Sequence, residues 1–357
     1  AAGSGMGVSG RGFSRRQSTL TRTREAKIMA KELEMGGYTK SVVKQWAYIS
    51  LKPEYFRKHR HRYERLSEQG IPAALRWRVW PILLDIFALR TTEPMLLAIH
   101  SAAEIPGDLQ STINADVTRT MPMFREFYPE GDAYEAGVES LRVMLHAYAS
   151  YNEEVGYTQG MSYIAATILV HSEDDKDAFF MLIQFMNRLG YSEAFRPGFP
   201  LLQIFTKEFK ILAGDMFPGT MEHLSNLGAE PEMYTDKYLL TMLGANFPVP
   251  AMLRAWDIIL TRMSLKPLMR SLLTVVKLSS DSLAKMDLER ALRWMQKDFA
   301  NPGSGVLDDM DRFLKVAKGL KYDADEVRAK AVAADADAMG GHKQKTLWAK
   351  MKHRLRK

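Results

Sequence analysis

The 357-residue chain is long enough for two domains, or for one large helical domain with tails, and its 46% hydrophobic residues can bury a sizeable core. It contains no cysteine, which excludes disulfide bonds and cysteine-ligated metals. Residues 1–24 and 342–357 hold five and seven basic residues without an acid, so the net charge of +7 leaves −5 for residues 25–341 and argues against a nucleic-acid-binding core.

The N-terminal part of the chain changes character near residue 25. Residues 1–24 are rich in Gly, Ser, Thr and Arg, a composition that predicts a flexible, disordered basic tail. Residues 25–69 are expected to form an N-terminal helical extension, which either packs on the following domain or only leads into it. Residues 71–89 are apolar, but Arg76, Arg78 and Asp85 interrupt them, so a membrane-spanning helix is rejected. With no secretory signal visible, the sequence favours a cytoplasmic protein.

Four segments of the body show the spacing of amphipathic helices. Apolar residues recur every three or four positions in residues 138–148, 179–189, 201–212 and 252–260. Gly190 is expected to end the second segment and Gly214 to cap the third, while Pro248 and Pro250 open the fourth. No convincing alternation of apolar and polar residues indicates a strand. The sequence therefore predicts an all-α body.

The composition changes again after about residue 320. Residues 322–339 are rich in alanine and acids, which predicts a weak helix or a linker. Leu347, Met351 and Leu355 then recur every four residues opposite seven basic side chains. Such a helix suits an anionic membrane surface or an acidic partner groove. A solvated or docked C-terminal helix explains the pattern equally well, and both interpretations stay open.

The sequence offers no site for independent hydrolysis. It has no phosphate-binding loop, zinc-protease motif, serine-hydrolase elbow or kinase catalytic loop. Two polar sites stand out instead, with Arg119 in the first and Gln159 in the second. An arginine that neutralises phosphoryl charge and a glutamine that orients a water are the parts that a GTPase active site most often lacks. A chain that carries both can complete the active site of another protein.

Several motifs follow one another over residues 70–315. Residues 70–76 run to Trp80-Pro81, and the pattern I-x-x-D-x-x-R-T-x-P is formed by Ile113, Asp116, Arg119, Thr120 and Pro122. Residues 152–161 surround Gln159, and residues 238–247 and 253–257 come later. In this order the segments resemble the opening motif, the arginine motif, the glutamine motif and the later helix pair of the TBC-domain GTPase-activating proteins of Rab-type small GTPases.

Two positions depart from the family pattern. Thr158 stands where many members carry cysteine, and Trp77 stands where a small residue is common. Neither change touches the arginine or the glutamine, so the expected chemistry is unaffected.

The resemblance implies a multi-helix TBC domain of two helical subdomains at residues 70–319, flanked by the extension at 25–69 and by residues 320–357. It implies that Arg119 and Gln159 act as arginine and glutamine fingers, supplied in trans to a Rab-family GTPase in its GTP state. GTP and Mg²⁺ would be bound by that partner, so the chain needs no cofactor and no metal of its own.

Supporting roles are implied for further motif residues: Ile113, Asp116, Asn152, Gly156, Tyr157 and Gly160. Asp116 precedes Arg119 by three positions, one helical turn, and is expected to hold the approach of the arginine. Ile113 and Pro122 are expected to anchor this segment. Tyr157 and Gly156 would shape the turn that presents Gln159, and Gly160 would allow close approach of the partner backbone.

Other motif residues are expected to be structural. Trp80 and Trp256 read as core aromatic residues, and Asp257 as a buried carboxylate that pairs with Arg254 or Arg76.

The alternative function is a non-catalytic Rab-binding scaffold in membrane trafficking. A scaffold can lose Arg119 and Gln159 freely, so the presence of both favours the activator. We also expect peripheral contact with endomembranes through the basic tails, and no binding of nucleic acid.

Overall fold

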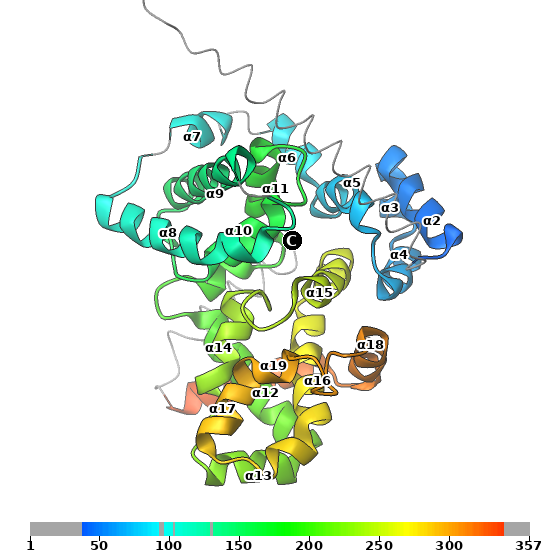
Figure 1. Cartoon of the computed structure of the whole chain (residues 1–357), viewed down its shortest axis with the longest axis vertical. Coiled ribbons are helices and arrows are strands. Elements are labelled where there is room, and N and C mark those ends of the chain that lie inside the picture. The colour runs from blue at the N-terminus through cyan, green and yellow to red at the C-terminus, as the bar shows by residue number, and fades with distance from the viewer. Residues whose placement is uncertain (1–37, 93–95, 103, 129–130, 339–357) are drawn as a thin grey trace, which may run out of the picture.

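The structure, a computed structural model, describes residues 38–338 except 93–95, 103 and 129–130. All regular elements in this part of the chain are helical, which confirms the predicted fold class (Figure 1). No described helix is both long enough and apolar enough to cross a membrane. The basic tail at 1–24 and the amphipathic helix expected at 342–357 lie outside the described residues.

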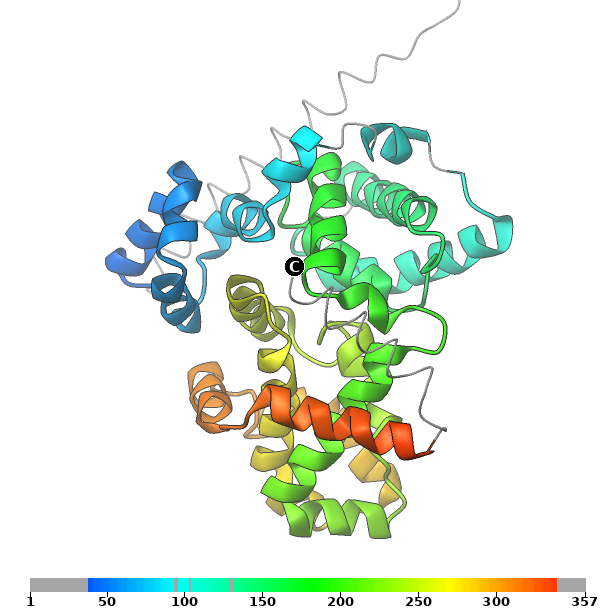
Figure 2. The same cartoon turned by 180° about the vertical axis from the view of Figure 1, so that it is seen from behind.

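The helices form two main groups, seen from opposite sides in Figures 1 and 2. The upper group begins with α2 (Lys40–Leu51), α3 (Pro53–Lys58) and α4 (Arg60–Leu66). It continues with α5 (Ala73–Leu84), α6 (Ile86–Thr92), α7 (Leu96–Ala102), α8 (Gly107–Thr120), α9 (Asp132–Tyr151), α10 (Met161–Leu169) and α11 (Asp175–Arg188). The lower group contains α12 (Pro200–Met216), α13 (Pro218–Asn226), α14 (Glu232–Leu240), α16 (Lys266–Leu283), α17 (Leu288–Gln296), α18 (Met310–Gly319) and α19 (Ala324–Ala338). Helix α15 (Val249–Arg262) lies between the groups.

The four predicted amphipathic segments correspond to α9, α11, α12 and α15; only Leu189, the last residue of the second segment, falls outside its helix, as the C-cap of α11. Helix α11 ends just before Gly190, which adopts a left-handed conformation as expected. The prediction that Gly214 caps the next helix is wrong, because α12 continues to Met216. The helix stops there because Pro218 disfavours helical geometry in the residue before it, Phe217.

The N-terminal extension packs on the rest of the molecule. Trp46 of α2 is fully buried, and its indole N–H donates to the carbonyl of Gly70 at 3.0 Å. Tyr63 of α4 is buried beside it, with 5.2 Å between the ring centroids. Helix α2 contacts α5, and α4 contacts α15. Residues 40–69 therefore contribute to the core instead of only leading into it.

A buried carboxylate joins the start of the domain to α15. Asp257 is 0% exposed and accepts hydrogen bonds from Arg76 Nη2 at 3.0 Å, Trp80 Nε1 at 3.0 Å and Ile71 N at 2.9 Å. Of the two arginines considered from the sequence, Arg76 is the partner. Arg254 instead reaches Asp311 at 3.2 Å. Burial of this charge is tolerated because donors surround it.

The alanine-rich segment after residue 322 is helical. Helix α19 packs along α12, and Arg328 forms an ion pair with the largely buried Glu208. The sequence left open whether this segment forms a weak helix or a linker, and the structure contains a helix.

Candidate functional site

Arg119 lies in the last turn of α8, where the two faces of the helix differ sharply. Ile113 and Val117 are completely buried and face the core, whereas the Arg119 side chain is 58% exposed. Helix α8 packs on α9 and α10. The buried face therefore fixes the helix while Arg119 remains accessible. Pro122 is exposed and does not anchor the segment as expected.

The anchoring role expected of Pro122 falls to its neighbours. Met121 and Phe124, in the 3₁₀ turn Met121–Phe124 that follows α8, are both fully buried. A 3₁₀ helix has three residues per turn, so Met121 and Phe124 lie on one face and Pro122 lies on another. The proline falls on the solvent side, so its contribution is the turn itself.

Asp116 links the arginine motif to the glutamine motif. It is nearly fully buried; one carboxylate oxygen accepts a hydrogen bond from Arg119 Nη2, and the other accepts the Tyr157 hydroxyl at 2.6 Å. This length is typical of a hydroxyl bonded to an ionised carboxylate. Burial raises the pKa of Tyr157 well above its ordinary value, and the bond to Asp116 raises it further. The phenol therefore stays protonated and keeps donating at neutral pH.

The loop after α9 presents Gln159. The carbonyl of Asn152 accepts the backbone N–H of Gly156 at 2.8 Å, and its side-chain Oδ1 accepts that of Val155 at 3.4 Å. Gly156 has φ +57°, which favours glycine at this turn. Gln159 is exposed, and no hydrogen bond to its side chain occurs within the described residues. Its amide is therefore free to turn toward a partner.

Gly160 is required by a contact within this chain. Its φ is +104°, and a Cβ at this position would lie 3.0 Å from the carbonyl oxygen of Leu240. This close approach is made by the backbone of the chain itself, and the approach of a partner backbone stays a prediction. Both the dihedral angle and the contact require glycine.

We expect Gly160→Ala to lower the free energy of unfolding by about 1–3 kcal/mol, because the added methyl group meets backbone at a strained dihedral angle. Gly219→Ala in α13 is the matched control, since a Cβ there meets nothing within 4 Å. Urea unfolding of both variants measures the difference. Equal stability of Gly160→Ala and the wild type would contradict the proposed crowding.

Two further contacts hold the site and were not foreseen. The buried hydroxyls of Thr120 and Ser162 lie 2.8 Å apart and join the end of α8 to α10. Arg196 binds Glu154 of the glutamine loop at 2.7 Å. Neither Ser162 nor Arg196 gives a local signal in the sequence, since each partner is 42 residues away. The Thr120–Ser162 and Asp116–Tyr157 bonds join the end of α8 to α10 and to the loop before it. Arg119 and Gln159 therefore lie on segments that contact each other.

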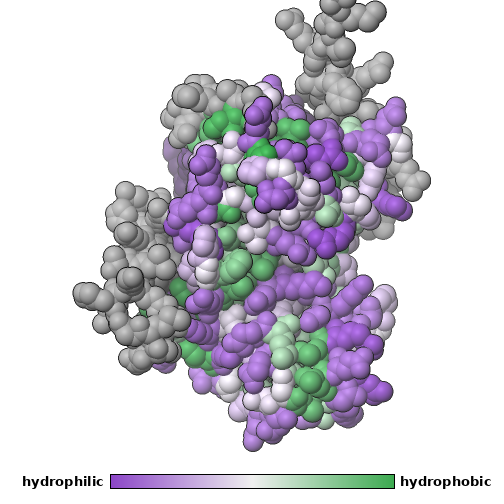
Figure 3. All heavy atoms as spheres, turned by 90° about the vertical axis from the view of Figure 1, so that its left-hand side faces the viewer, coloured by the Kyte–Doolittle hydropathy of each residue, from purple (hydrophilic) through white to green (hydrophobic). Residues whose placement is uncertain are grey.

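Figure 3 shows the side of the molecule that lies at the left of Figure 1. Hydrophobic side chains appear at mid-height and also within the upper and lower parts of this face, with hydrophilic residues between them.

More than half of the chain matches a known domain family. The model of the Rab-GTPase-TBC domain family matches residues 73–284. The Rab GTPase-activating protein tbc-11 of Caenorhabditis elegans is 29% identical over 239 residues, which cover 66% of this chain and 25% of that protein. The GTPase-activating protein GYP5 of Eremothecium gossypii is 28% identical over 238 residues, 67% of this chain and 27% of that protein. The chain thus spans about a quarter of the length of these two relatives.

Two solved structures share the fold. The Ypt/Rab-GAP domain of Gyp1p superposes with a TM-score of 0.60 at 18% identity, covering 73% of this chain and 92% of that one. The Chlamydomonas flagellar RabGAP TBC domain gives a TM-score of 0.60 at 19% identity, covering 87% and 95%. At this identity the likeness concerns the fold alone.

Proposed function

Because the chain belongs to the Rab-GTPase-TBC domain family, we propose that it is a GTPase-activating protein for a Rab-family small GTPase. The observation that carries the proposal is the buried Asp116, which bonds both to Arg119 and to Tyr157 of the glutamine loop. Around this carboxylate the chain presents one exposed guanidinium and one exposed amide. The names of its relatives support the same activity.

The chemistry proposed for these two side chains follows from the needs of GTP hydrolysis. Water attacks the γ-phosphorus, the bond to the bridging oxygen breaks, and GDP and phosphate leave; charge neutralisation and water positioning dominate catalysis. Arg119 would place its planar donor fork on the γ-phosphate and bridging oxygens. Gln159 would orient the attacking water. GTP and Mg²⁺ would be held by the partner.

Asp116 would act as a positioning residue in this proposal. In the free chain it holds Arg119 at the helix end, and the arginine must leave the carboxylate to reach the phosphate. The Tyr157 hydroxyl would continue to donate to Asp116 after that departure, so the buried carboxylate keeps a partner throughout.

The test is single-turnover GTP hydrolysis by a panel of purified, GTP-loaded Rab proteins with and without this chain. Acceleration of at least one Rab supports the proposal and identifies the substrate. Binding to a GTP-loaded Rab without acceleration of any member would instead favour the non-catalytic scaffold.

Contact with endomembranes through the basic tails is part of the proposal. Residues 342–357 carry seven basic and no acidic side chains, and each basic residue near an anionic surface contributes about 1 kcal/mol. We expect deletion of these residues to weaken binding to phosphatidylserine vesicles at least about tenfold without changing turnover in solution. Phosphatidylcholine vesicles are the control. Unchanged binding to both would remove the tail from this role.

A further inference from the structure

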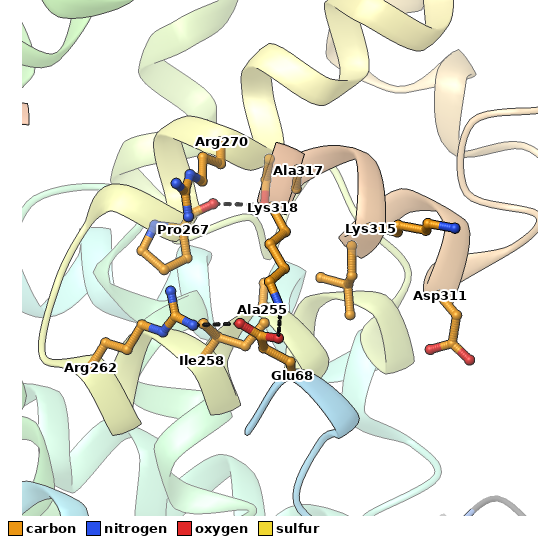
Figure 4. A pocket seen from close by; sticks show the side chains of 12 residues that line it. Glu68, Ala255, Ile258, Arg262, Pro267, Arg270, Asp311, Lys315, Ala317 and Lys318 are labelled. Carbon is orange, nitrogen blue, oxygen red and sulfur yellow. Dashed lines mark hydrogen bonds and ion pairs between the residues drawn. The ribbon is translucent and has the colours of Figure 1, made fainter. Parts of the chain in front are cut away.

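A second concave site lies away from Arg119 and Gln159. A cavity of about 260 Å³ opens where the turn Ser67–Gln69 meets α15, α16 and α18 (Figure 4). Helices α8 and α18 lie on opposite sides of the molecule in both Figures 1 and 2. The cavity is therefore remote from Arg119, which lies on α8.

The cavity combines an apolar lining with a cationic one. Ala255, Ile258 and Leu314 contribute apolar surface. Glu68 is the central acid, with Arg262 at 2.7 Å on one oxygen and Lys318 at 2.6 Å on the other. The other acidic lining residue is 86% exposed at the rim and is already paired with Arg254.

Arg270 adds a further cation that has no carboxylate within ion-pair distance among the described residues. Its Nε donates to the carbonyl of Leu320 at 3.0 Å. Four basic side chains line the cavity, Arg262, Arg270, Lys315 and Lys318, against the two acids Glu68 and Asp311, which leaves an excess of two positive charges. A phosphate dianion matches this excess, whereas a single carboxylate would neutralise half of it.

The cations of the cavity lie close enough to repel one another. Burial lowers the pKa of Arg270, and the nearby Arg262 lowers it further, although Tyr322 and Glu68 act in the opposite direction. Cations that are partly removed from water and repel one another gain most from a bound anion.

We propose that this cavity binds a phosphate-bearing anion, with Arg262, Arg270 and Lys318 as donors to the phosphoryl oxygens. Arginine suits this role because its planar fork donates two parallel hydrogen bonds to a phosphate. The volume is below that of most sites for drug-sized ligands, which favours a compact phosphate ester or a lipid headgroup over a nucleotide. Glu68 competes with the anion for the same donors and so sets the affinity.

Calorimetric titration of the full chain with inorganic phosphate tests the site. Arg270→Gln is expected to weaken binding about tenfold, the scale of one close charge contact. Arg290→Gln in α17 removes the same charge from an exposed position and is expected to leave the affinity within about twofold. Arg270→Lys, which keeps the charge, is expected to fall between Arg270→Gln and the wild type.

Glu68→Gln gives a test with the opposite sign. It frees Arg262 and Lys318, so phosphate binding is expected to strengthen about tenfold even though the loss of two ion pairs lowers the melting temperature. A variant that merely damaged the fold would bind more weakly. Equal affinities of Arg270→Gln, Glu68→Gln and the wild type, or no binding by any, would overturn the proposal.

Vesicles distinguish the two sources of phosphate. All variants keep both basic tails, so a difference between them reports the cavity alone. Weaker binding of Arg270→Gln to phosphatidylcholine vesicles that contain a phosphorylated phosphatidylinositol assigns the site to a lipid headgroup. An effect on inorganic phosphate without an effect on these vesicles assigns it to a soluble phosphate ester.

Discussion

Arg119→Ala is expected to reduce the acceleration of GTP hydrolysis by about 10³–10⁵-fold, the range found for arginine fingers in other GTPase systems. In energy this corresponds to roughly 4–7 kcal/mol of barrier. The loss is expected because alanine leaves the charge that develops on the γ-phosphate without a donor from this chain. Single-turnover hydrolysis with the responsive Rab measures it.

The fold is expected to tolerate this change. The Arg119 side chain is 58% exposed but that of Asp116 is only 4% exposed, so the loss of this half-exposed pair is expected to cost about 1–3 kcal/mol. Asp116, left behind, retains the hydrogen bond from Tyr157. Arg119→Lys keeps the positive charge but lacks the planar pair of guanidinium donors, so it should remain largely inactive. Arg290→Ala, which changes a remote and exposed arginine, should be fully active. Full activity of Arg119→Ala would remove this residue from catalysis.

Gln159→Ala, measured in the same assay, tests the contribution of the glutamine separately from that of Arg119. The side chain is exposed and has no hydrogen bond within the described part of the chain, so the melting temperature should not change. Turnover is expected to fall strongly unless the glutamine of the partner takes over the water. Loss of turnover in Arg119→Ala alone would therefore assign water positioning to the Rab.

Local patterns were enough to predict four of the helices, whereas the ordered set of family motifs singled out Arg119 and Gln159. Apolar spacing located α9, α11, α12 and α15, because the buried face of each helix repeats within its own sequence. The three-residue separation of Asp116 and Arg119 correctly placed them in contact. The same reasoning failed at Gly214, where the residue that precedes a proline ends the helix two positions later than the glycine suggested.

Contacts between distant segments could not be predicted in this way. Gly160 is crowded by Leu240, and Glu154 is held by Arg196, yet neither contact leaves a periodic trace in the sequence. The cavity beside Glu68 depends on α18, whose Lys318 follows that residue by 250 positions. Only the packing of the helices reveals that these charges face one another.

Asp257→Ala is expected to destabilise the chain by about 3–5 kcal/mol, the cost of leaving one member of a buried ion pair without its partner. Arg76, with a side chain only 6% exposed, would lose its counter-charge. The N–H groups of Trp80 and Ile71 would lose their acceptor in the same step. Urea unfolding measures the change, and Asp311→Ala, which breaks an exposed pair with Arg254, should cost less than about 1 kcal/mol.

A double variant, Arg76→Met with Asp257→Leu, distinguishes the charge from the hydrogen bonds. It removes both charges, so it should recover part of the stability lost in Asp257→Ala, but Trp80 and Ile71 still lack an acceptor. Asp257 binds residues 71–80 to α15 and has no contact with Arg119 or Gln159 among its hydrogen bonds. Its loss should therefore lower activity only as far as it lowers the folded fraction. A fully folded Asp257→Ala protein without activity would show that α15 also positions the catalytic residues.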